Sequence, residues 1–324
     1  MSAARSKIVT ITPNPAIDIA TSVPMVVPLQ KLRCTAARRD PGGGGINVAR
    51  VVQRLGGNAI AIYPAGGSTG HLLRRLVDGE NIESVIIEIA EETREDFTVT
   101  EERSGQQYRF VLPGAPLRET EWKECLNAVA HTEAAPFLVA SGSLPPNVPE
   151  DFYARVARIA KRLGSKMVLD TSGAALTVAL QEGVYLLKPN LRELQELANC
   201  PLSGPDAWVE ASRRLVTSGQ AEVVALSLGH RGALLITADD AYRAHAPDVH
   251  VVSAVGAGDS FLGAMVRHLA CGASLVEAFR YGVAAGSAAV LNPGTELCHA
   301  VDLDQLYTEI QIESLSGTRL ISAA

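Results

Sequence analysis

Short and almost wholly apolar runs alternate with longer helical patterns along most of this 324-residue chain. The apolar runs cover residues 8–11, 59–62, 137–140, 167–169, 184–187 and 223–226. The helical patterns between them include residues 46–55, 72–78, 150–163, 206–216 and 257–270. Continuous runs of Val, Ile and Leu are typical of strands that are buried on both faces. The alternation therefore predicts an α/β fold with a doubly wound, mostly parallel sheet flanked by helices.

Two stretches, at about residues 17–40 and 93–112, depart from this alternation. In the second stretch, two β-prone segments flank Arg103-Ser104-Gly105 and predict a β-hairpin. A few strands outside the main sheet cannot bury a face by themselves. We therefore expect one domain over residues 1–324, with a small β-stranded lid that covers the sheet or pairs with a second copy in a homodimer.

Composition narrows the choice of partners and compartment. The net charge is −6 and the basic residues are scattered, so the sequence offers no footprint for nucleic acid. The uncharged stretches are too short and too rich in Gly and Pro to span a membrane. The five cysteines are widely spaced and odd in number, which favours reduced thiols in a cytoplasm. We expect a soluble cytoplasmic protein that acts on small molecules.

A run of four glycines, Gly42 to Gly45, leads directly into a helical pattern that carries Asn47. Glycines allow close approach of the backbone, and the start of a helix offers unpaired N–H groups to a polar or anionic ligand. A flexible turn is the alternative interpretation. The amide of Asn47, one turn into the helix, favours a site for the hydroxyl groups of a polyol.

A second glycine turn, Gly256-Ala257-Gly258, comes directly before Asp259 and the apolar helical pattern that follows. Its backbone N–H groups would converge on the oxygens of a phosphoryl group in transfer, and Asp259 would take a proton from the attacking hydroxyl. The helix N-terminus should favour the ionised form of Asp259. The alternative is that Asp259 only caps the helix.

Several common motifs are not found in the sequence. The chain contains no Gly-Lys dipeptide, which excludes a P-loop, and residues 256–261 lack the third glycine of a dinucleotide-binding fingerprint. There is no H-E-x-x-H motif or cysteine-based metal cluster. Residues 66–70 do match the G-x-S-x-G motif of serine hydrolases, so a hydrolase with Ser68 as nucleophile remains an alternative from another class.

Four segments form an ordered pattern over nearly the whole chain. They are residues 43–66, which begin with the glycine run; Asn190-Leu191-Arg192-Glu193; Ser227-Leu228-Gly229; and residues 255–266, which contain Asp259. In residue type, order and spacing they resemble the signatures of the PfkB-type, ribokinase-like carbohydrate kinases. That resemblance implies a ribokinase-like fold and transfer of a phosphoryl group from ATP to a sugar hydroxyl.

Further segments resemble the ATP-dependent, minor-type 6-phosphofructokinases of that family. The likeness is carried by residues 31–36, 42–50, 107–110, 141–146 and 282–289. It implies magnesium-dependent phosphorylation of fructose 6-phosphate at O1 to give fructose 1,6-bisphosphate. Tagatose-6-phosphate kinases and 1-phosphofructokinases share much of the pattern and remain alternatives. A non-catalytic sugar-phosphate sensor is a further alternative, although binding alone does not require a base beside an anion hole.

The resemblance implies a role for each matching residue. The catalytic group comprises the base Asp259 and the anion hole of Gly256, Ala257 and Gly258. The residues implied to bind the substrate are Asp18, Gly43, Gly44, Asn47 and Ser143 at the sugar hydroxyls, with Asp259, and Lys31, Arg33 and Arg94 at the phosphate already on the sugar. The residues implied to bind ATP are Lys188, Asn190, Ser227, Gly229, Gly232, Gly256, Gly258 and Asn292. Glu193, through water, and Asn190 are the candidates for Mg²⁺.

Two positions depart from the family pattern. Many members have Asp-Thr or Ser-Thr where this chain has Ser253-Ala254, so one hydroxyl near the nucleotide is missing. Glu296 stands where close relatives are expected to have a neutral or basic residue. Potassium is a candidate cofactor of this family, and both departures put a potassium site in doubt.

Overall fold

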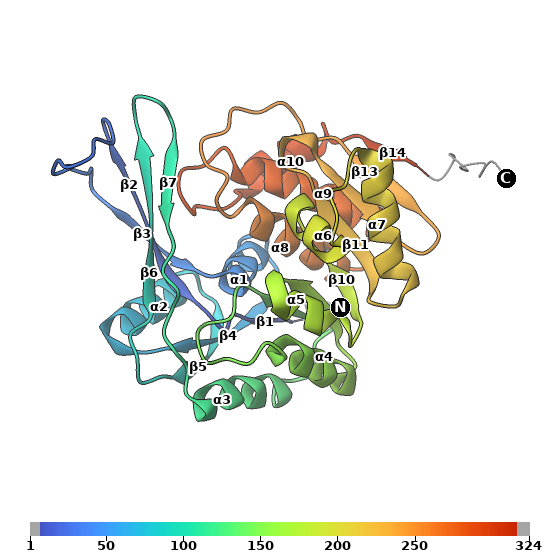
Figure 1. The fold of residues 1–324 in the computed structure, drawn as a ribbon, viewed down its shortest axis with the longest axis horizontal. Coiled ribbons are helices and arrows are strands. Elements are labelled where there is room, and N and C mark those ends of the chain that lie inside the picture. The colour runs from blue at the N-terminus through green and yellow to red at the C-terminus, as the bar shows by residue number, and fades with distance from the viewer. Residues whose placement is uncertain (1–6, 316–324) are drawn as a thin grey trace.

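A computed structural model describes residues 7–315, so the ends of the expected domain, 1–6 and 316–324, lie outside the described residues. The body of the protein is one ten-stranded sheet with helices on both faces (Figure 1). In spatial order, its strands are β14 (Ile312–Ser314), β13 (Ala241–Ala244), β12 (Ala233–Ile236), β11 (Ala221–Ser227), β10 (Val184–Leu187), β9 (Lys166–Asp170), β8 (Phe137–Ser141), β1 (Ile8–Ile11), β4 (Ala59–Ala65) and β5 (Glu83–Glu88).

The sheet is parallel from β5 to β11, and β12 to β14 continue it in antiparallel fashion. Neighbouring residues of a strand face opposite sides, so each parallel strand supplies both cores. In β8, for example, Phe137 and Val139 pack into one core whereas Leu138 and Ala140 pack into the other. The expected α/β fold with a mostly parallel sheet is confirmed.

Within residues 7–315, five helices cover each face of the sheet. One core receives α1 (Gly44–Arg54), α2 (Gly67–Gly79), α8 (Ala257–Ala270), α9 (Leu275–Ala289) and α10 (Ala300–Tyr307). The other core receives α3 (Glu119–Ala130), α4 (Phe152–Leu163), α5 (Gly173–Leu180), α6 (Leu191–Ala198) and α7 (Pro205–Thr217). The helices end where the sequence supplies suitable residues. Gly164, for example, adopts a left-handed conformation (φ 69°) that terminates α4. Within residues 7–315, none of the helices is both long and apolar enough to cross a membrane.

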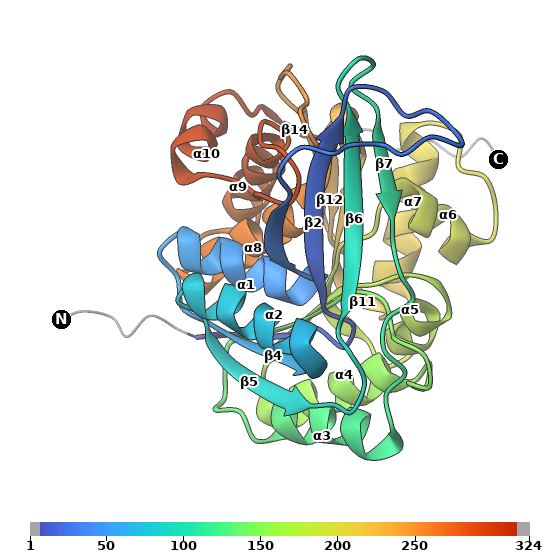
Figure 2. The same ribbon diagram turned by 90° about the vertical axis from the view of Figure 1, so that its left-hand side faces the viewer.

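A second, four-stranded sheet stands away from the body and forms the lid (Figure 2). Its strands, in spatial order, are β3 (Arg38–Gly42), β2 (Ala16–Val23), β6 (Arg94–Glu101) and β7 (Gln107–Phe110). β2 pairs in parallel with β6 and antiparallel with β3, and β6 and β7 form an antiparallel hairpin. The lid leaves apolar side chains exposed, including Phe97 (37%) and Phe110 (56%). The small β-stranded lid expected from the sequence is thus present.

Candidate active site

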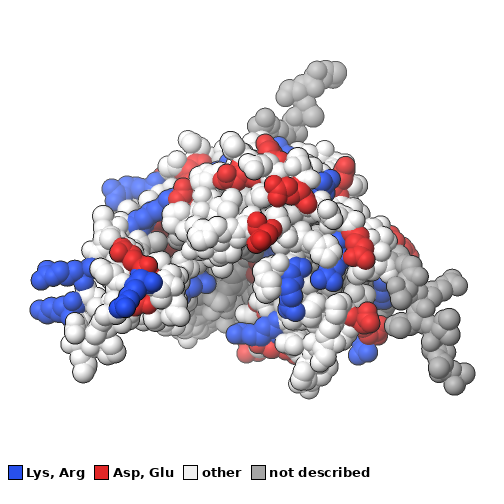
Figure 3. All heavy atoms as spheres, turned by 90° about the horizontal axis from the view of Figure 1, so that it is seen from above, with Lys and Arg blue, Asp and Glu red and all other residues white. Residues whose placement is uncertain are grey.

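Several residues of the candidate site lie at the carboxyl ends of the parallel strands, where open α/β sheets usually bind their ligands. Ser143 follows β8, Asp170 ends β9, Lys188 follows β10 and Ser227 ends β11. The space-filling view from above shows the molecule indented between the lid and the body (Figure 3). A cleft of about 580 Å³ between them is lined by residues that include Arg94, Ser143 and Ser172.

Asp259 lies in the first turn of α8, directly after a tight glycine turn. Gly256 is the N-cap residue and adopts a left-handed conformation (φ 76°), so Asp259 is not the cap of this helix. The N–H groups of Ala257, Gly258 and Asp259 have no acceptor within the helix, because they belong to its first turn. The Asp259 carboxylate instead accepts a hydrogen bond from Asn47 Nδ2 at 2.9 Å. A carboxylate and a set of free backbone donors therefore stand side by side.

The surroundings of Asp259 favour its protonated form more than the helix alone predicts. Burial raises the pKa of Asp259 to about 6, and the charge of Asp170 adds to the rise. The hydrogen bond from Asn47 and the charges of Lys188 and Arg109 lower this pKa but do not cancel the effect. The carboxyl group is removed from water and faces a second carboxylate, and these two effects act against the helix N-terminus, which favours the ionised form. At neutral pH most of Asp259 is nonetheless ionised.

Lys188 brings a positive charge to the glycine turn. It is only 5% exposed, and its ammonium group pairs with Asp170 at 3.1 Å. A Cβ atom on Gly258 would lie 3.3 Å from Lys188 Nζ, so the absence of a side chain there lets the lysine approach the turn. The structure thus places Lys188 and Gly258, two candidates far apart in the sequence, next to each other.

The first glycine run passes close to Asp18 on the lid strand β2. A Cβ atom on Gly42 would lie 2.5 Å from Asp18 Cγ, and Gly43 has a φ of 106° that favours glycine. Burial raises the pKa of Asp18 to about 7, with a further contribution from Asp96. At neutral pH Asp18 can therefore both donate and accept hydrogen bonds, which suits a sugar hydroxyl.

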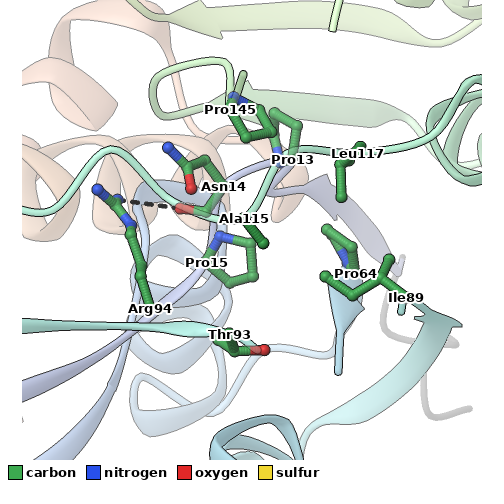
Figure 4. A pocket seen from close by; sticks show the side chains of 10 residues that line it. All are labelled: Pro13, Asn14, Pro15, Pro64, Ile89, Thr93, Arg94, Ala115, Leu117 and Pro145. Carbon is green, nitrogen blue, oxygen red and sulfur yellow. Dashed lines mark hydrogen bonds between the residues drawn. The ribbon is translucent and has the colours of Figure 1, made fainter. Parts of the chain in front are cut away.

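Arg94 lies at the base of the lid beside a small pocket of about 10 Å³, which Asn14 also lines (Figure 4). The guanidinium of Arg94 donates to the backbone oxygens of Leu112 (2.6 Å) and Asn14 (3.1 Å). The side-chain amide of Asn14 in turn donates to Ser143 Oγ at 3.0 Å. Within the described residues Arg94 Nε has no hydrogen-bond partner. Arg94 is thus held in place by the backbone and keeps one donor free.

Lys31 and Arg33 have quite different surroundings. Both are exposed in the segment between β2 and β3, and neither makes a hydrogen bond or ion pair with another residue of 7–315. Figure 3 shows Lys and Arg side chains that project from the lid end of the molecule. The structure does not bring Lys31 and Arg33 into contact with the other candidates.

Asn190 and Glu193 cap helix α6. Asn190 Oδ1 accepts from the backbone N–H of Glu193 at 3.0 Å, and a Glu193 carboxylate oxygen accepts from the backbone N–H of Asn190 at 2.8 Å. This reciprocal capping box is a structural role that the sequence interpretation did not include. Burial raises the pKa of Glu193, and the charge of Asp170 adds to that rise. No group of three His, Cys, Asp or Glu side chains that could hold a metal occurs within residues 7–315.

The remaining nucleotide candidates lie in two loops. The backbone of Ser227 forms an isolated parallel β-bridge with that of Asn190, and Gly229 begins the short 3₁₀ helix η1 (Gly229–Arg231). Gly232 has a φ of 87°, and a Cβ atom there would lie 2.9 Å from the Ala244 carbonyl carbon, so only glycine fits. The side-chain amide of Asn292 donates to the backbone oxygens of Ala288 (3.2 Å) and Leu297 (3.0 Å) and thereby shapes its own loop.

The two positions that depart from the family pattern flank that loop. Ser253 is buried and donates to the Gly294 oxygen at 3.1 Å, whereas Ala254 is exposed. Glu296 forms an ion pair with Arg38 of the lid and a hydrogen bond with His299. Glu296 therefore joins the loop to the base of the lid.

Ser68 does not have the surroundings of a hydrolase nucleophile. It lies at the start of α2, and its Oγ donates to Glu92 at 3.1 Å. The Glu92 carboxylate also accepts from the backbone N–H groups of Ser68 and Thr69. No histidine within residues 7–315 forms a hydrogen bond with Ser68. The G-x-S-x-G match is a helix start stabilised by a carboxylate.

Three charged residues near the site were missed as candidates. Asp170 follows an apolar strand run, and its place at a carboxyl strand end could have been recognised. Arg109 on β7 lowers the pKa of both Asp18 and Asp259, but nothing in a short β-prone segment shows which body residues it faces. Arg50 lies three residues after Asn47 on α1, a spacing that places both side chains on one helix face.

Comparisons with known proteins agree with this geometry. The sequence profile of the pfkB family carbohydrate kinases matches residues 12–301. The chain is 47% identical to ATP-dependent 6-phosphofructokinase isozyme 2 of Mycobacterium tuberculosis, over 94% of this chain and 89% of that protein. It is 46% identical to the isozyme 2 of Escherichia coli K12, over 93% of this chain and 98% of that protein. The crystal structure of phosphofructokinase-2 from Escherichia coli with substrates and products superimposes with a TM-score of 0.90, at 45% identity over 94% of this chain and 99% of that one.

Proposed function

The chain belongs to the pfkB family of carbohydrate kinases, and from this we propose that it transfers the γ-phosphoryl group of ATP to O1 of fructose 6-phosphate. The product is fructose 1,6-bisphosphate. The observation that carries the proposal is the juxtaposition of Asp259, the open first turn of α8 and the buried Lys188. A base, a set of anion donors and a cation at one point are what phosphoryl transfer to a hydroxyl requires.

In this mechanism Asp259 accepts the proton of the O1 hydroxyl while that oxygen attacks the γ-phosphorus. The bond from the γ-phosphorus to the bridging oxygen breaks, and ADP leaves. The N–H groups of Ala257 and Gly258, together with Lys188, stabilise the negative charge on the phosphoryl oxygens. Asp18, Asn47, Ser143 and the backbone at Gly43 and Gly44 hold the sugar hydroxyls, which fixes the attacking oxygen in line.

Arg94, Lys31 and Arg33 would bind the phosphate already present on the sugar. Guanidinium groups suit that task because they bind phosphate oxygens in a bidentate manner. Ser227, Gly229, Gly232 and Asn292 would line the nucleotide side of the cleft.

The residues near Lys188 fit a magnesium ion bound through water. Burial raises the Glu193 pKa and the charge of Asp170 adds to the rise, so a divalent cation would be favoured there. One Glu193 carboxylate oxygen accepts the hydrogen bond of the helix cap, and the other would be available to a water bound to the ion. Glu193 would hold the ion through water and Asn190 would assist; when bound, the ion neutralises charge on the ATP phosphates.

Potassium is a candidate activator, because a structure of the Escherichia coli phosphofructokinase-2 is in complex with potassium. The loop from Ser253 to Val255 and the loop from Asn292 to Glu296 would form the site here. The ion pair between Glu296 and Arg38 occupies one side of that loop pair. We therefore expect potassium activation to be weak.

The exposed apolar residues of the lid support a homodimer. Phe97 and Phe110 lie on strands that cannot bury a face alone, Val111 follows β7, and a second lid would cover all three side chains. A tetrameric inhibited form is known for the Escherichia coli phosphofructokinase-2. Light scattering should give the mass of a dimer at micromolar concentration, and a fully active monomer would refute this pairing. Cys34, Cys200 and Cys271 are exposed free thiols, which favours a reducing cytoplasm.

A substrate panel tests the proposed function. Purified protein with ATP and magnesium is offered fructose 6-phosphate, fructose 1-phosphate, tagatose 6-phosphate and fructose, and ADP release is followed. We expect the highest kcat/KM with fructose 6-phosphate, and a loss of activity as the pH falls below about 6, where Asp259 becomes protonated. Faster turnover of fructose 1-phosphate or tagatose 6-phosphate would show that this sugar, and not fructose 6-phosphate, is the substrate. Binding of a sugar phosphate without turnover would favour a non-catalytic sugar-phosphate sensor.

A further inference from the structure

Arg50 is the largest charged side chain in the core, with 0% of it exposed. Its guanidinium donates to the Pro41 oxygen at the end of β3 (3.0 Å), to Asn47 Oδ1 (3.1 Å) and to the Thr295 oxygen (3.3 Å). Its Nε donates to Glu80 at the end of α2 at 2.9 Å. These contacts join the lid base, the start of α1, the 292–297 loop and α2 at a single point.

The contact with Asn47 determines which way that amide faces. A guanidinium can only donate hydrogen bonds, so the group of Asn47 that faces Arg50 must be its oxygen. The NH₂ group of Asn47 then points away from Arg50, and it donates to Asp259 at 2.9 Å. If the amide were reversed, its oxygen would face a carboxylate and its NH₂ group would face a cation. Arg50 thus selects the only orientation in which Asn47 donates to Asp259.

We propose that Arg50 is a positioning residue, whose buried guanidinium holds Asn47 in the orientation that donates to the catalytic base. This inference rests on the proposed function, because it assigns Asp259 the role of base. It goes beyond that function by adding a residue that contacts neither substrate in the proposed mechanism. A buried arginine is costly unless it is paired, and Glu80 and Asp40 supply the opposite charge at 2.9 Å and 3.5 Å.

Arg54, one turn further along α1, provides a matched control. It donates to both carboxylate oxygens of Glu80 and to the Glu296 backbone oxygen, so it has the same anchors on α2 and the 292–297 loop. It does not contact Asn47 in the described structure. Arg54→Lys therefore weakens comparable contacts with α2 and the 292–297 loop, but it has no direct effect on the side-chain amide of Asn47.

The charged groups around Asp259 come from several elements. Asp170 of β9 and Asp18 of β2 are its acidic neighbours. Lys188 after β10 and Arg109 of β7 are its positively charged neighbours. Arg50→Lys leaves these four residues in place and keeps the positive charge at position 50, which also lowers the pKa of Asp18. A change in the titration of Asp259 in this variant therefore reports on the Asn47 amide rather than on net charge.

The experiment measures the pKa of Asp259 directly, by ¹³C NMR of its carboxyl group in the ligand-free protein, with Asp259→Asn for assignment. We expect Arg50→Lys to raise that pKa by about half a unit or more, because the hydrogen bond that stabilises the ionised form is weakened. Arg54→Lys should leave it unchanged. In an Asn47→Ala background, Arg50→Lys should have no further effect.

The acid limb of kcat/KM against pH should shift in the same direction, with kcat reduced about tenfold in Arg50→Lys. An unchanged Asp259 titration in Arg50→Lys, or an equal shift in the Asn47→Ala background, would overturn the proposal. If Arg50→Lys does not fold, Glu80→Gln loosens the far end of the same guanidinium. It should then give a smaller shift of the same sign that disappears with Asn47→Ala. An inactive wild-type protein with these NMR shifts would refute the proposed function but leave the positioning of Asn47 established.

Discussion

The two ends of the candidate site differ in how much the protein has organised them in advance. At the Asp259 end, Asn47, Lys188 and Asp170 are held by hydrogen bonds and ion pairs in or near the core. At the lid end, Lys31 and Arg33 are exposed and have no partner within residues 7–315. Charge that develops in a transition state is best stabilised by groups already in place, whereas a charged substrate can order flexible side chains as it binds. The difference predicts that changes at the first end reduce kcat and changes at the second raise KM.

The largest effect is expected at Asp259. Asp259→Asn keeps the size of the side chain and an oxygen that can accept from Asn47, but it removes the base. We expect kcat to fall roughly 10²- to 10⁴-fold while fructose 6-phosphate and ATP still bind. Asp206→Asn is the control. Asp206 is also in the first turn of a helix, α7, but its side chain is exposed and it is far from Asp259 in the sequence. Turnover of Asp259→Asn within a few-fold of wild type would remove the catalytic assignment.

The lid charges should give a smaller effect of a different kind. The double variant Lys31→Ala, Arg33→Ala should raise KM for fructose 6-phosphate about tenfold or more, since two charge-assisted contacts to phosphate are lost. Its kcat and Tm should stay near those of the wild type, because neither side chain has a partner in the described structure. The control is the double variant Arg75→Ala, Arg162→Ala, which removes two exposed arginines elsewhere in the protein. Steady-state kinetics compare the two double variants. A fall in kcat with KM unchanged would contradict the distinction between the two ends.

The raised pKa values of the Asp18 and Asp259 carboxyl groups should also affect the stability of the folded protein. The pKa of Asp18 is raised to about 7 and that of Asp259 to about 6, so the folded state binds protons more tightly than the unfolded state. The stability that these groups contribute is present below about pH 4 and is lost as the pH rises through their folded pKa values. Asp18→Asn and Asp259→Asn should each stabilise the ligand-free protein at pH 8 by about 1–2 kcal/mol.

Thermal melts at pH 8 and pH 5 test this, with the gain in Tm shrinking at the lower pH. A helix-capping Asp259, the alternative offered by the sequence, would predict almost no change in the stability of Asp259→Asn, because Asn caps a helix about as well as Asp does. The structure changes that expectation, since Gly256 is the cap and Asp259 is partly buried beside Asp170. An equal or lower Tm for both variants at pH 8 would show that the acids are better solvated than the structure indicates.

The sequence predicted the central strands and the glycine turns well, because both are local patterns. It did not identify the edge strand β5, in which Glu83 and Glu88 bound a very short apolar run, nor the short antiparallel strands β12 and β13. The partners of Asp259 lie on α1, β9 and after β10, and the spacing along the chain does not show which of these strand ends are neighbours. Arg50 illustrates the same limit, since its buried contacts extend from Pro41 to Thr295.

The smallest effect is expected at Ala254, which lies between the two ends. Its neighbour Ser253 is buried and ties the loop to Gly294, whereas Ala254 is exposed, so a larger side chain can be accommodated without displacing packed atoms. Ala254→Thr restores a hydroxyl that could reach a nucleotide phosphate or a potassium ion. We expect KM for ATP to fall, or potassium activation to increase, by about two- to threefold, because one exposed hydrogen bond contributes about 0.5–1 kcal/mol. KM for fructose 6-phosphate should not change, since the residues proposed to bind the sugar lie on the lid, at α1 and after β8. Kinetics in potassium and in sodium separate the two effects, and three unchanged parameters would show that this departure from the family pattern is neutral.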